Sequence, residues 1–196
     1  MQFYKFVSIM WILYRRFNHL YKLTVRKDSN KQLFIGMMEK KLNDVKVEDA
    51  ISMHYNLFTA AKKLNSLYSI ELFLMVTGHM TNLVYQVHSL LERIKDNKVL
   101  TFGNYSWLGI LFACFHLFII TASCHFTSWK ANKISEEIFS AYSSINNTAQ
   151  DNSRSTMYFH KKKLNFTSLN GLFNVDLPLL MSLIGASTTL LVVLLK

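Results

Sequence analysis

The chain has 196 residues, of which 51% are hydrophobic, with a single proline and a net charge of +10. Its hydrophobic residues are gathered in long blocks, which indicates a membrane protein and argues against one soluble domain. The positive charge is compatible with nucleic acid, with anionic lipid, or with the basic bias of cytoplasmic loops, and the position of the charges decides between these.

The first apolar segment, residues 3–14, is about 12 residues long, which is short of the roughly 17 that a membrane span needs. Lys5 followed by apolar residues faintly suggests a signal peptide. However, Tyr14, Arg15, Arg16 and Phe17 stand where a cleavage site would need small residues. The segment is therefore predicted to be the end of a membrane helix whose beginning is not in this chain.

A helical pattern follows, in which apolar residues alternate at steps of four and three: Met53, Leu57, Ala60, Leu64 and Leu67. It leads into a candidate span, Leu67 to Val87. Glu71 and His79 interrupt this span, and such residues normally face a protein interior or a watery cavity.

The clearest span is Tyr105 to Thr127, which carries no charge and would be about 34 Å long as a helix. Cys114 and Cys124 lie in it about 15 Å apart along the axis, so they cannot pair with each other. After it comes a second apolar stripe: Ala131, Ile134, Ile138, Ala141 and Ile145. Both stripes must be buried, either in an ordinary helical core or in a subunit interface.

A polar stretch, Asn146 to Ser155, predicts a loop. The last candidate span is Leu177 to Leu195, with Pro178 in the first turn, where its missing N–H costs nothing. The predicted fold is therefore an all-α, polytopic membrane bundle of about three full spans plus the end of a fourth, with cytoplasmic helical extensions.

Lysine and arginine are dense before Leu67 and again between Ser128 and Asp176, but sparse between His88 and Asn104. By the positive-inside rule the two basic regions are cytoplasmic, and the carboxy terminus is exterior. Four divisions are predicted. Residues 1–66 are the end of a membrane helix and a cytoplasmic helical region, and residues 67–127 are two spans with a short exterior loop. Residues 128–176 are a second cytoplasmic helical region, and residues 177–196 are the final span. Because the charge lies in loops beside spans, no nucleic-acid partner is expected.

Patterns for catalysis, phosphate cradling and metal binding are lacking, so neither an enzyme nor a cofactor or metal is predicted. The histidines at 79, 116 and 125 are single residues in candidate spans, where packing or cavity roles are commoner than metal ligation.

The carboxy-terminal third carries Gly171-Leu172-Phe173-Asn174-Val175-Asp176 before the last helix and Ile184-Gly185-Ala186-Ser187-Thr188-Thr189-Leu190 within it. This resembles the end of insect gustatory receptors, in which Gly-Leu-Phe-x-Ile-Asp precedes Ile-Gly-Ala-x-Thr-Thr-Tyr and a closing Gln-Phe. Leu13 to Leu20 and Leu64 to Tyr68 look like the flanks of the family's fourth and fifth helices. In this chain Leu190 replaces the tyrosine and Lys196 replaces the glutamine.

The resemblance implies a plasma-membrane taste receptor, a subunit of a tetrameric, ligand-gated, non-selective cation channel for small-molecule tastants, made of one or several kinds of subunit. The final helix would surround the pore, with a pore-lining stripe of Ser182, Gly185, Ala186, Thr189 and Lys196. Such a stripe also fits close helix packing. A lysine at the outer mouth would oppose cation flow.

By resemblance, the tastant pocket would include His79, Asn82, Tyr85 and Trp107, which could equally be packed interior residues or, for Trp107, an interfacial aromatic. Because the family has seven spans, the chain is expected to represent its carboxy-terminal portion. The alternatives are an odorant receptor of the same superfamily, a fragment without function, and a transporter fragment. A transporter would be expected to show broken helices or several intramembrane charges, and only Glu71 qualifies.

Overall fold

The computed structural model describes residues 2–29, 37–95, 105–145, 163–169 and 171–194. Within these residues the chain is mostly helical. The helices are α1 (Gln2–Ser29), α2 (Met37–Lys95), α3 (Tyr105–Ile145) and α5 (Leu177–Leu194), and two short strands, β1 (Thr167–Ser168) and β2 (Phe173–Asn174), precede α5. The predicted helical fold is therefore confirmed in part, because the described residues are mostly helical but include one small hairpin that the prediction did not include.

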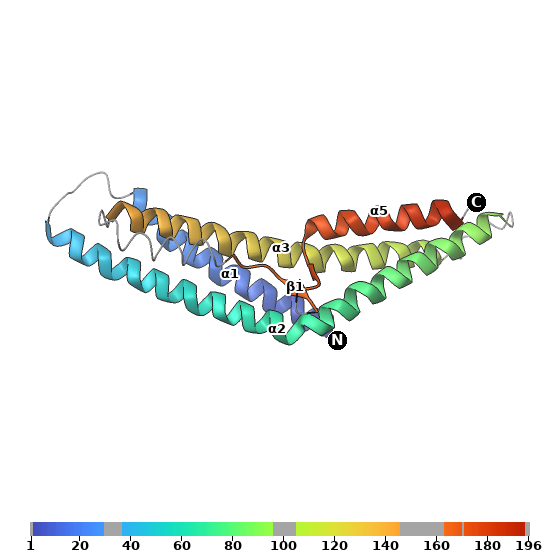
Figure 1. Ribbon diagram of the computed structural model, residues 1–196, viewed down its shortest axis with the longest axis horizontal. Helices are drawn as coiled ribbons and strands as arrows, with labels where there is room; N and C mark the ends of the chain where they lie inside the picture. Colours follow the sequence, from blue (N-terminus) through green and yellow to red (C-terminus); the bar gives the residue numbers. More distant parts are fainter. Residues whose placement is uncertain (1, 30–36, 96–104, 146–162, 170, 195–196) are drawn as a thin grey trace.

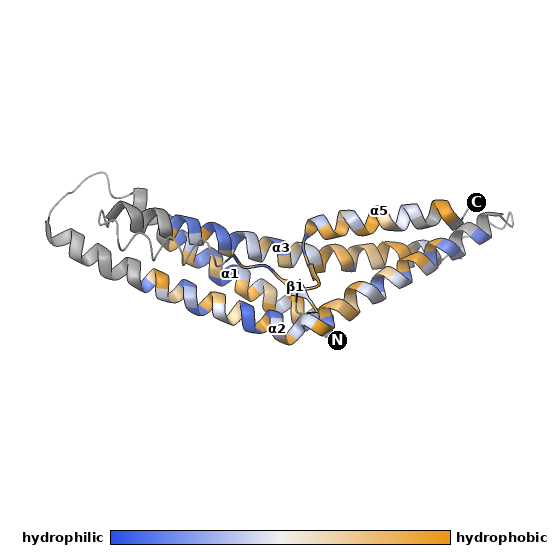
Figure 2. Ribbon diagram, in the orientation of Figure 1, coloured by the Kyte–Doolittle hydropathy of each residue, from blue (hydrophilic) through white to orange (hydrophobic). Residues whose placement is uncertain are grey.

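The helices form an elongated molecule with two arms, because α2 and α3 run antiparallel along its whole length (Figure 1). Helix α1 lies beside one half of this pair and α5 lies beside the other half. We name the first half the α1 arm (α1, residues 49–66 and residues 128–138) and the second half the α5 arm (α5, residues 67–92 and residues 107–127). Hydrophobic residues dominate the α5 arm, while the α1 arm carries more hydrophilic surface (Figure 2).

Helix α1 buries one continuous face in the α1 arm. Its buried side chains recur at steps of four and three: Phe6, Met10, Leu13, Phe17 and Leu20. They pack in one core with side chains of α2 and α3 such as Phe58 and Ile134. Burial of each large apolar side chain stabilises the fold by about 1.5–3 kcal/mol. This helix continues to Ser29, well past the apolar segment at residues 3–14 from which it was predicted.

The apolar stripe predicted on α3 is buried as expected at Ala131, Ile134 and Ile138, while the side chains of Ala141 and Ile145 lie outside those described. The stripe predicted on α2 is confirmed only in part: Leu57 and Leu64 are half-buried against this core, whereas Met53, Ala60 and Leu67 are exposed. The buried face is shifted by one position.

The buried residues of α2 in the α1 arm are His54, Phe58 and Ala61. Moving along a helix by one residue turns the side chain by about 100°. The α2 sequence offers apolar residues on both faces, and the position of α1 and α3 decides which of them is buried.

The hairpin crosses between the arms. Its strands are antiparallel, with Thr167 opposite Asn174 and Ser168 opposite Phe173. The turn requires left-handed backbone at Leu169 (φ 46°) and Gly171 (φ 113°), and the second of these suits glycine, which has no Cβ. Asp176 then begins α5 by accepting a hydrogen bond at Oδ1 from the Leu179 N–H at 3.0 Å, as an N-cap does.

Two asparagines hold the hairpin on the long helices. The side chain of Asn65 on α2 donates to Thr167 Oγ1 (3.1 Å) and accepts from the Thr167 N–H (3.0 Å). In the same way, Asn132 on α3 donates to the Leu164 carbonyl (3.1 Å) and accepts from the Leu164 N–H (2.8 Å). Because each amide uses both its donor and its acceptor, the hairpin is held in one register against α2 and α3.

One helix among the described residues is long and apolar enough to cross a membrane, over Trp107–Ile138 of α3. The apolar part of α5, Leu177–Thr189, is shorter. In the α5 arm the second half of α2, the first half of α3 and α5 run side by side over a similar length (Figure 1).

Candidate functional site

Two histidines from different helices are stacked in the α5 arm. The rings of His79 on α2 and His116 on α3 have centroids 5.2 Å apart and planes inclined by 28°. His116 is buried, and the rings of Phe3 (4.5 Å) and Phe112 (3.9 Å) lie against it. The site is therefore an aromatic cluster with imidazole groups at its centre.

The orientation of the His116 ring is set by its own helix. Its Nδ1 lies 2.8 Å from the Phe112 carbonyl oxygen, which can only accept, so Nδ1 carries the proton and donates it. In the neutral ring this leaves Nε2 as an acceptor. The cluster can thus offer a hydrogen-bond acceptor within an otherwise apolar region, which suits recognition of a small ligand that carries a donor.

The other residues predicted for the pocket are exposed on the surface of the chain. Asn82, Tyr85 and Trp107 are all exposed, with Tyr85 68% exposed. Of the four predicted pocket residues, His79 is the one whose ring stacks on His116. The sequence showed His79 and His116 only as separate polar interruptions of apolar segments, and nothing in their spacing indicated that they would stack.

A close approach of α2 and α3 lies beyond this cluster, toward the end of α2. A Cβ added at Gly109 would stand 3.0 Å from Cδ and Nε2 of Gln86. Any larger residue at position 109 would therefore push the Gln86 side chain away. The absence of a side chain at Gly109 lets these two helices pack closely.

Glu71 occupies the α2 segment next to the hairpin and is half-buried. Its Oε2 is buried and has no hydrogen-bond partner among the described residues.

Helix α5 presents its small and polar face away from the rest of the chain. Ser182, Gly185, Ala186 and Thr189 are all exposed, and no atom lies within 4 Å of a Cβ built on Gly185. Ser187 is instead buried, on the face that meets the other helices. Lys196, predicted at the end of this stripe, lies outside the described residues.

The hydroxyl groups on this face are satisfied by their own helix. Ser182 Oγ donates to the Pro178 carbonyl at 3.1 Å, and Thr189 Oγ1 donates to the Gly185 carbonyl at 2.9 Å. The face can therefore be exposed to a membrane, to water or to a second helix without leaving an unpaired donor.

The family of this chain is shown by comparison with known proteins. Residues 1–195 match the family described as 7tm Chemosensory receptor. The chain belongs to this insect gustatory receptor family. The receptors of this family are non-enzymatic, polytopic membrane proteins. No curated protein matches the chain.

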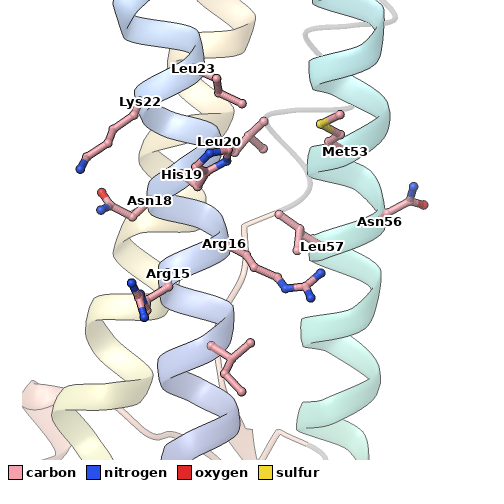
Figure 3. Close-up of a pocket in the computed structure, with 11 residues that line it drawn as sticks. Arg15, Arg16, Asn18, His19, Leu20, Lys22, Leu23, Met53, Asn56 and Leu57 are labelled. Atoms are coloured by element: carbon pink, nitrogen blue, oxygen red, sulfur yellow. The ribbon is translucent and has the colours of Figure 1, made fainter.

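The receptor also has an open groove of about 720 Å³ between α1 and α2 in the α1 arm (Figure 3). Arg16 points into the space between the two helices, near Leu57, whereas Arg15, Asn18 and Lys22 point to the other side of α1. No pattern in the sequence indicated this groove, because its walls come from segments far apart in the chain.

Proposed function

We propose that this receptor is a subunit of a tetrameric, non-selective cation channel that opens when a small tastant binds. The observation that carries the proposal is the exposed small and polar face of α5, which turns away from the helices of its own chain. In a tetramer this face would meet its copies around a central axis, with Ser182, Gly185, Ala186 and Thr189 toward the pore and Lys196 at its outer mouth. Small residues allow such close approach of helices.

We further propose that three segments cross the membrane: residues 67–87 of α2, residues 105–127 of α3 and residues 177–195. Their position together in the α5 arm supports this, since a helix of about 20 residues matches the thickness of one bilayer. The α1 arm would then be cytoplasmic except for the start of α1, which would be the end of a membrane helix. The rest of residues 1–66 and residues 128–176 would lie on the inner side, and the carboxy terminus would lie outside the plasma membrane. The distribution of lysine and arginine supports that orientation.

The tastant would contact His79 and its partner His116 within the membrane. Asn82, Tyr85 and Trp107 would complete the pocket where other helices of the assembled receptor cover them. The acceptor nitrogen of His116 favours ligands with a hydroxyl or amine group over purely apolar ones.

A crosslinking experiment tests the arrangement of α5 without a measurement of ion current. The full chain is expressed in insect cell membranes with the exposed Cys114 changed to Ser, and a cysteine is introduced at Ala186. We expect oxidation to give disulfide-linked dimers on non-reducing gels, because the α5 faces of neighbouring subunits would lie close together.

Met181→Cys is the matched control, because Met181 is also exposed on α5 but lies on another side of the helix. Monomers for both variants under oxidation would overturn the proposed meeting of α5 helices. Equal dimer yields for both would indicate random collision and would overturn it as well.

The orientation has its own test in glycosylation. Asn165-Phe166-Thr167 is predicted to stay unmodified because it would be cytoplasmic, whereas Asn104-Tyr105-Ser106 is predicted to be exterior. Glycosidase treatment followed by electrophoresis of Asn104→Gln and Asn165→Gln proteins distinguishes the two. Sugar on Asn165 would reverse the orientation.

A further inference from the structure

A cluster of lysines and aromatic rings lies where α1 and α3 pack, just beyond the proposed membrane segment of α3. The ammonium group of Lys130 stands 3.6 Å from the centre of the Tyr21 ring and 5.9 Å from that of Trp129. The ammonium group of Lys133 lies 5.4 Å and 5.3 Å from the same two rings. Two positive charges are therefore held around one pair of aromatic side chains.

The lysine cluster lacks a balancing negative charge among the described residues. Lys22 on α1 and Lys133 both act on Lys130 as nearby positive charges. No carboxylate of a described residue lies within 4.0 Å of these three ammonium groups, although Glu136 and Glu137 follow in the same helix. Positive charges that lie close together repel each other, so an added anion would stabilise the cluster.

The depth of the cluster matches the headgroup layer of a bilayer. From Trp107 to Thr127 a helix extends about 30 Å, the thickness of the hydrocarbon core, and Lys130 lies one turn farther on. Trp129 is 49% exposed, and tryptophan and tyrosine are the residues that gather at the membrane interface.

An exposed apolar surface leads along α3 to the lysines. Its side chains lie within one side of the helix, at angles set by 100° per residue: Leu111, Phe115, Phe118, Phe126 and Trp129. Lys133 falls on the same side. A molecule with an acyl chain and a phosphate would match both parts of this surface, whereas a water-soluble phosphate would use only the lysines.

We propose that Lys22, Lys130 and Lys133, with Tyr21 and Trp129, form a binding site for the phosphate headgroup of an anionic phospholipid whose acyl chain lies along α3. Anionic lipids are concentrated in the cytoplasmic leaflet, on the side where the proposed orientation puts the cluster. This inference uses the membrane placement of α3 and does not depend on conduction or on a tastant.

The test uses the full chain purified in uncharged detergent micelles and titrated with a short-chain phosphatidylinositol phosphate, with binding followed by native mass spectrometry. We expect the double substitution Lys130→Gln/Lys133→Gln to weaken binding about thirtyfold, because each of the two basic residues near a lipid headgroup contributes about 1 kcal/mol and about 1.4 kcal/mol is a factor of ten. The matched control is Lys62→Gln/Lys63→Gln, which removes the same charge from exposed positions on α2 and is expected to change binding less than about twofold.

Since Lys130 is buried and its replacement could unfold the α1 arm, Lys22→Gln/Lys133→Gln provides a second variant that leaves Lys130 in place. Circular dichroism confirms that each variant is helical. Equal losses in the α1–α3 variants and in the Lys62/Lys63 control would overturn the site, because binding would then follow net charge.

Two further titrations distinguish the source of the phosphate. Short-chain phosphatidylcholine is expected to bind at least about tenfold more weakly than the anionic lipid, because it has no net negative charge. The free inositol phosphate is expected to bind more weakly than the lipid, because it cannot cover the apolar side of α3. Equal affinity for the free headgroup would overturn the lipid assignment, and failure of the channel proposal would leave every one of these results unchanged.

Discussion

The two arms of the molecule differ in how far large hydrophobic side chains are exposed, because most of the exposed ones lie in the α5 arm. In the α1 arm, Phe6, Phe17 and Ile134 are fully buried by contacts within the chain. In the α5 arm, Phe115 on α3 is 61% exposed and Met181 on α5 is 70% exposed. The first pattern is that of an ordinary protein core in water, and the second is that of a surface which lipid or another subunit covers. This difference supports the proposed placement of the α5 arm in the membrane.

The largest expected effect comes from the core of the α1 arm. Phe17→Ala should lower the free energy of unfolding by about 3–5 kcal/mol, because it removes a fully buried ring and leaves a cavity. Denaturant unfolding of the full chain in detergent micelles, followed by circular dichroism, measures the change. Phe115→Ala in the α5 arm is the control and should change stability by less than about 1 kcal/mol. Similar losses in both variants would remove the distinction between the arms.

The junction between the arms should be the next most sensitive region. Asn132→Ala should destabilise the hairpin by about 1–3 kcal/mol, because it leaves the Leu164 N–H and carbonyl without their partner. Hydrogen exchange of residues 163–169 should become faster. Asn56→Ala on the exposed side of α2 is the control. Unchanged exchange in the Asn132 variant would mean that the hairpin is held by other contacts.

The start of α5 should respond more weakly. Asp176→Ala should cost about 0.5–2 kcal/mol, because Asp176 caps the helix by accepting the Leu179 N–H. Faster hydrogen exchange in the first turn of α5, with no change in α1, is the expected result. Asp176→Asn should retain most of the protection, since an asparagine side chain can also cap.

The smallest effect concerns pH. Burial holds the pKa of His54 below its ordinary value of 6.5, although its Nε2–H donates to the Ala131 carbonyl at 3.3 Å. Above pH 6.5 the ring is neutral in both folded and unfolded chains. Below that pH the unfolded chain takes up the proton that the folded ring resists, so the stability of the α1 arm should decrease as the pH falls.

Melting temperatures of the full chain between pH 7.5 and pH 5.5 measure this decrease. His54→Gln should flatten the pH dependence, because glutamine does not titrate, whereas the same change at exposed His19 should leave it in place. A slope that survives in the His54 variant would assign the dependence to other groups.

Several features of the fold could be predicted from the sequence. The uncharged run from Tyr105 to Thr127 predicted the apolar part of α3, and the stripe of Ala131, Ile134 and Ile138 predicted its buried face. The family was indicated by the Gly-Leu-Phe-x-x-Asp element at 171–176 and by the final helix. A motif of specific residues at fixed spacing can be recognised in the sequence without knowing which residues are in contact.

Other features were decided only by tertiary structure. The buried face of α2 carries His54 and Phe58, not Met53 and Ala60, because both faces have apolar residues and only the neighbouring helices select one. The stacking of His79 on His116 joins residues from two helices, and spacing within a helix says nothing about such a pair. The sequence by itself determined which segments are helical and apolar, since those properties are local. The buried face of α2, the pairing of His79 with His116 and the cluster of Lys130 and Lys133 with Tyr21 depend on packing between helices. Such packing joins residues that are far apart in the sequence.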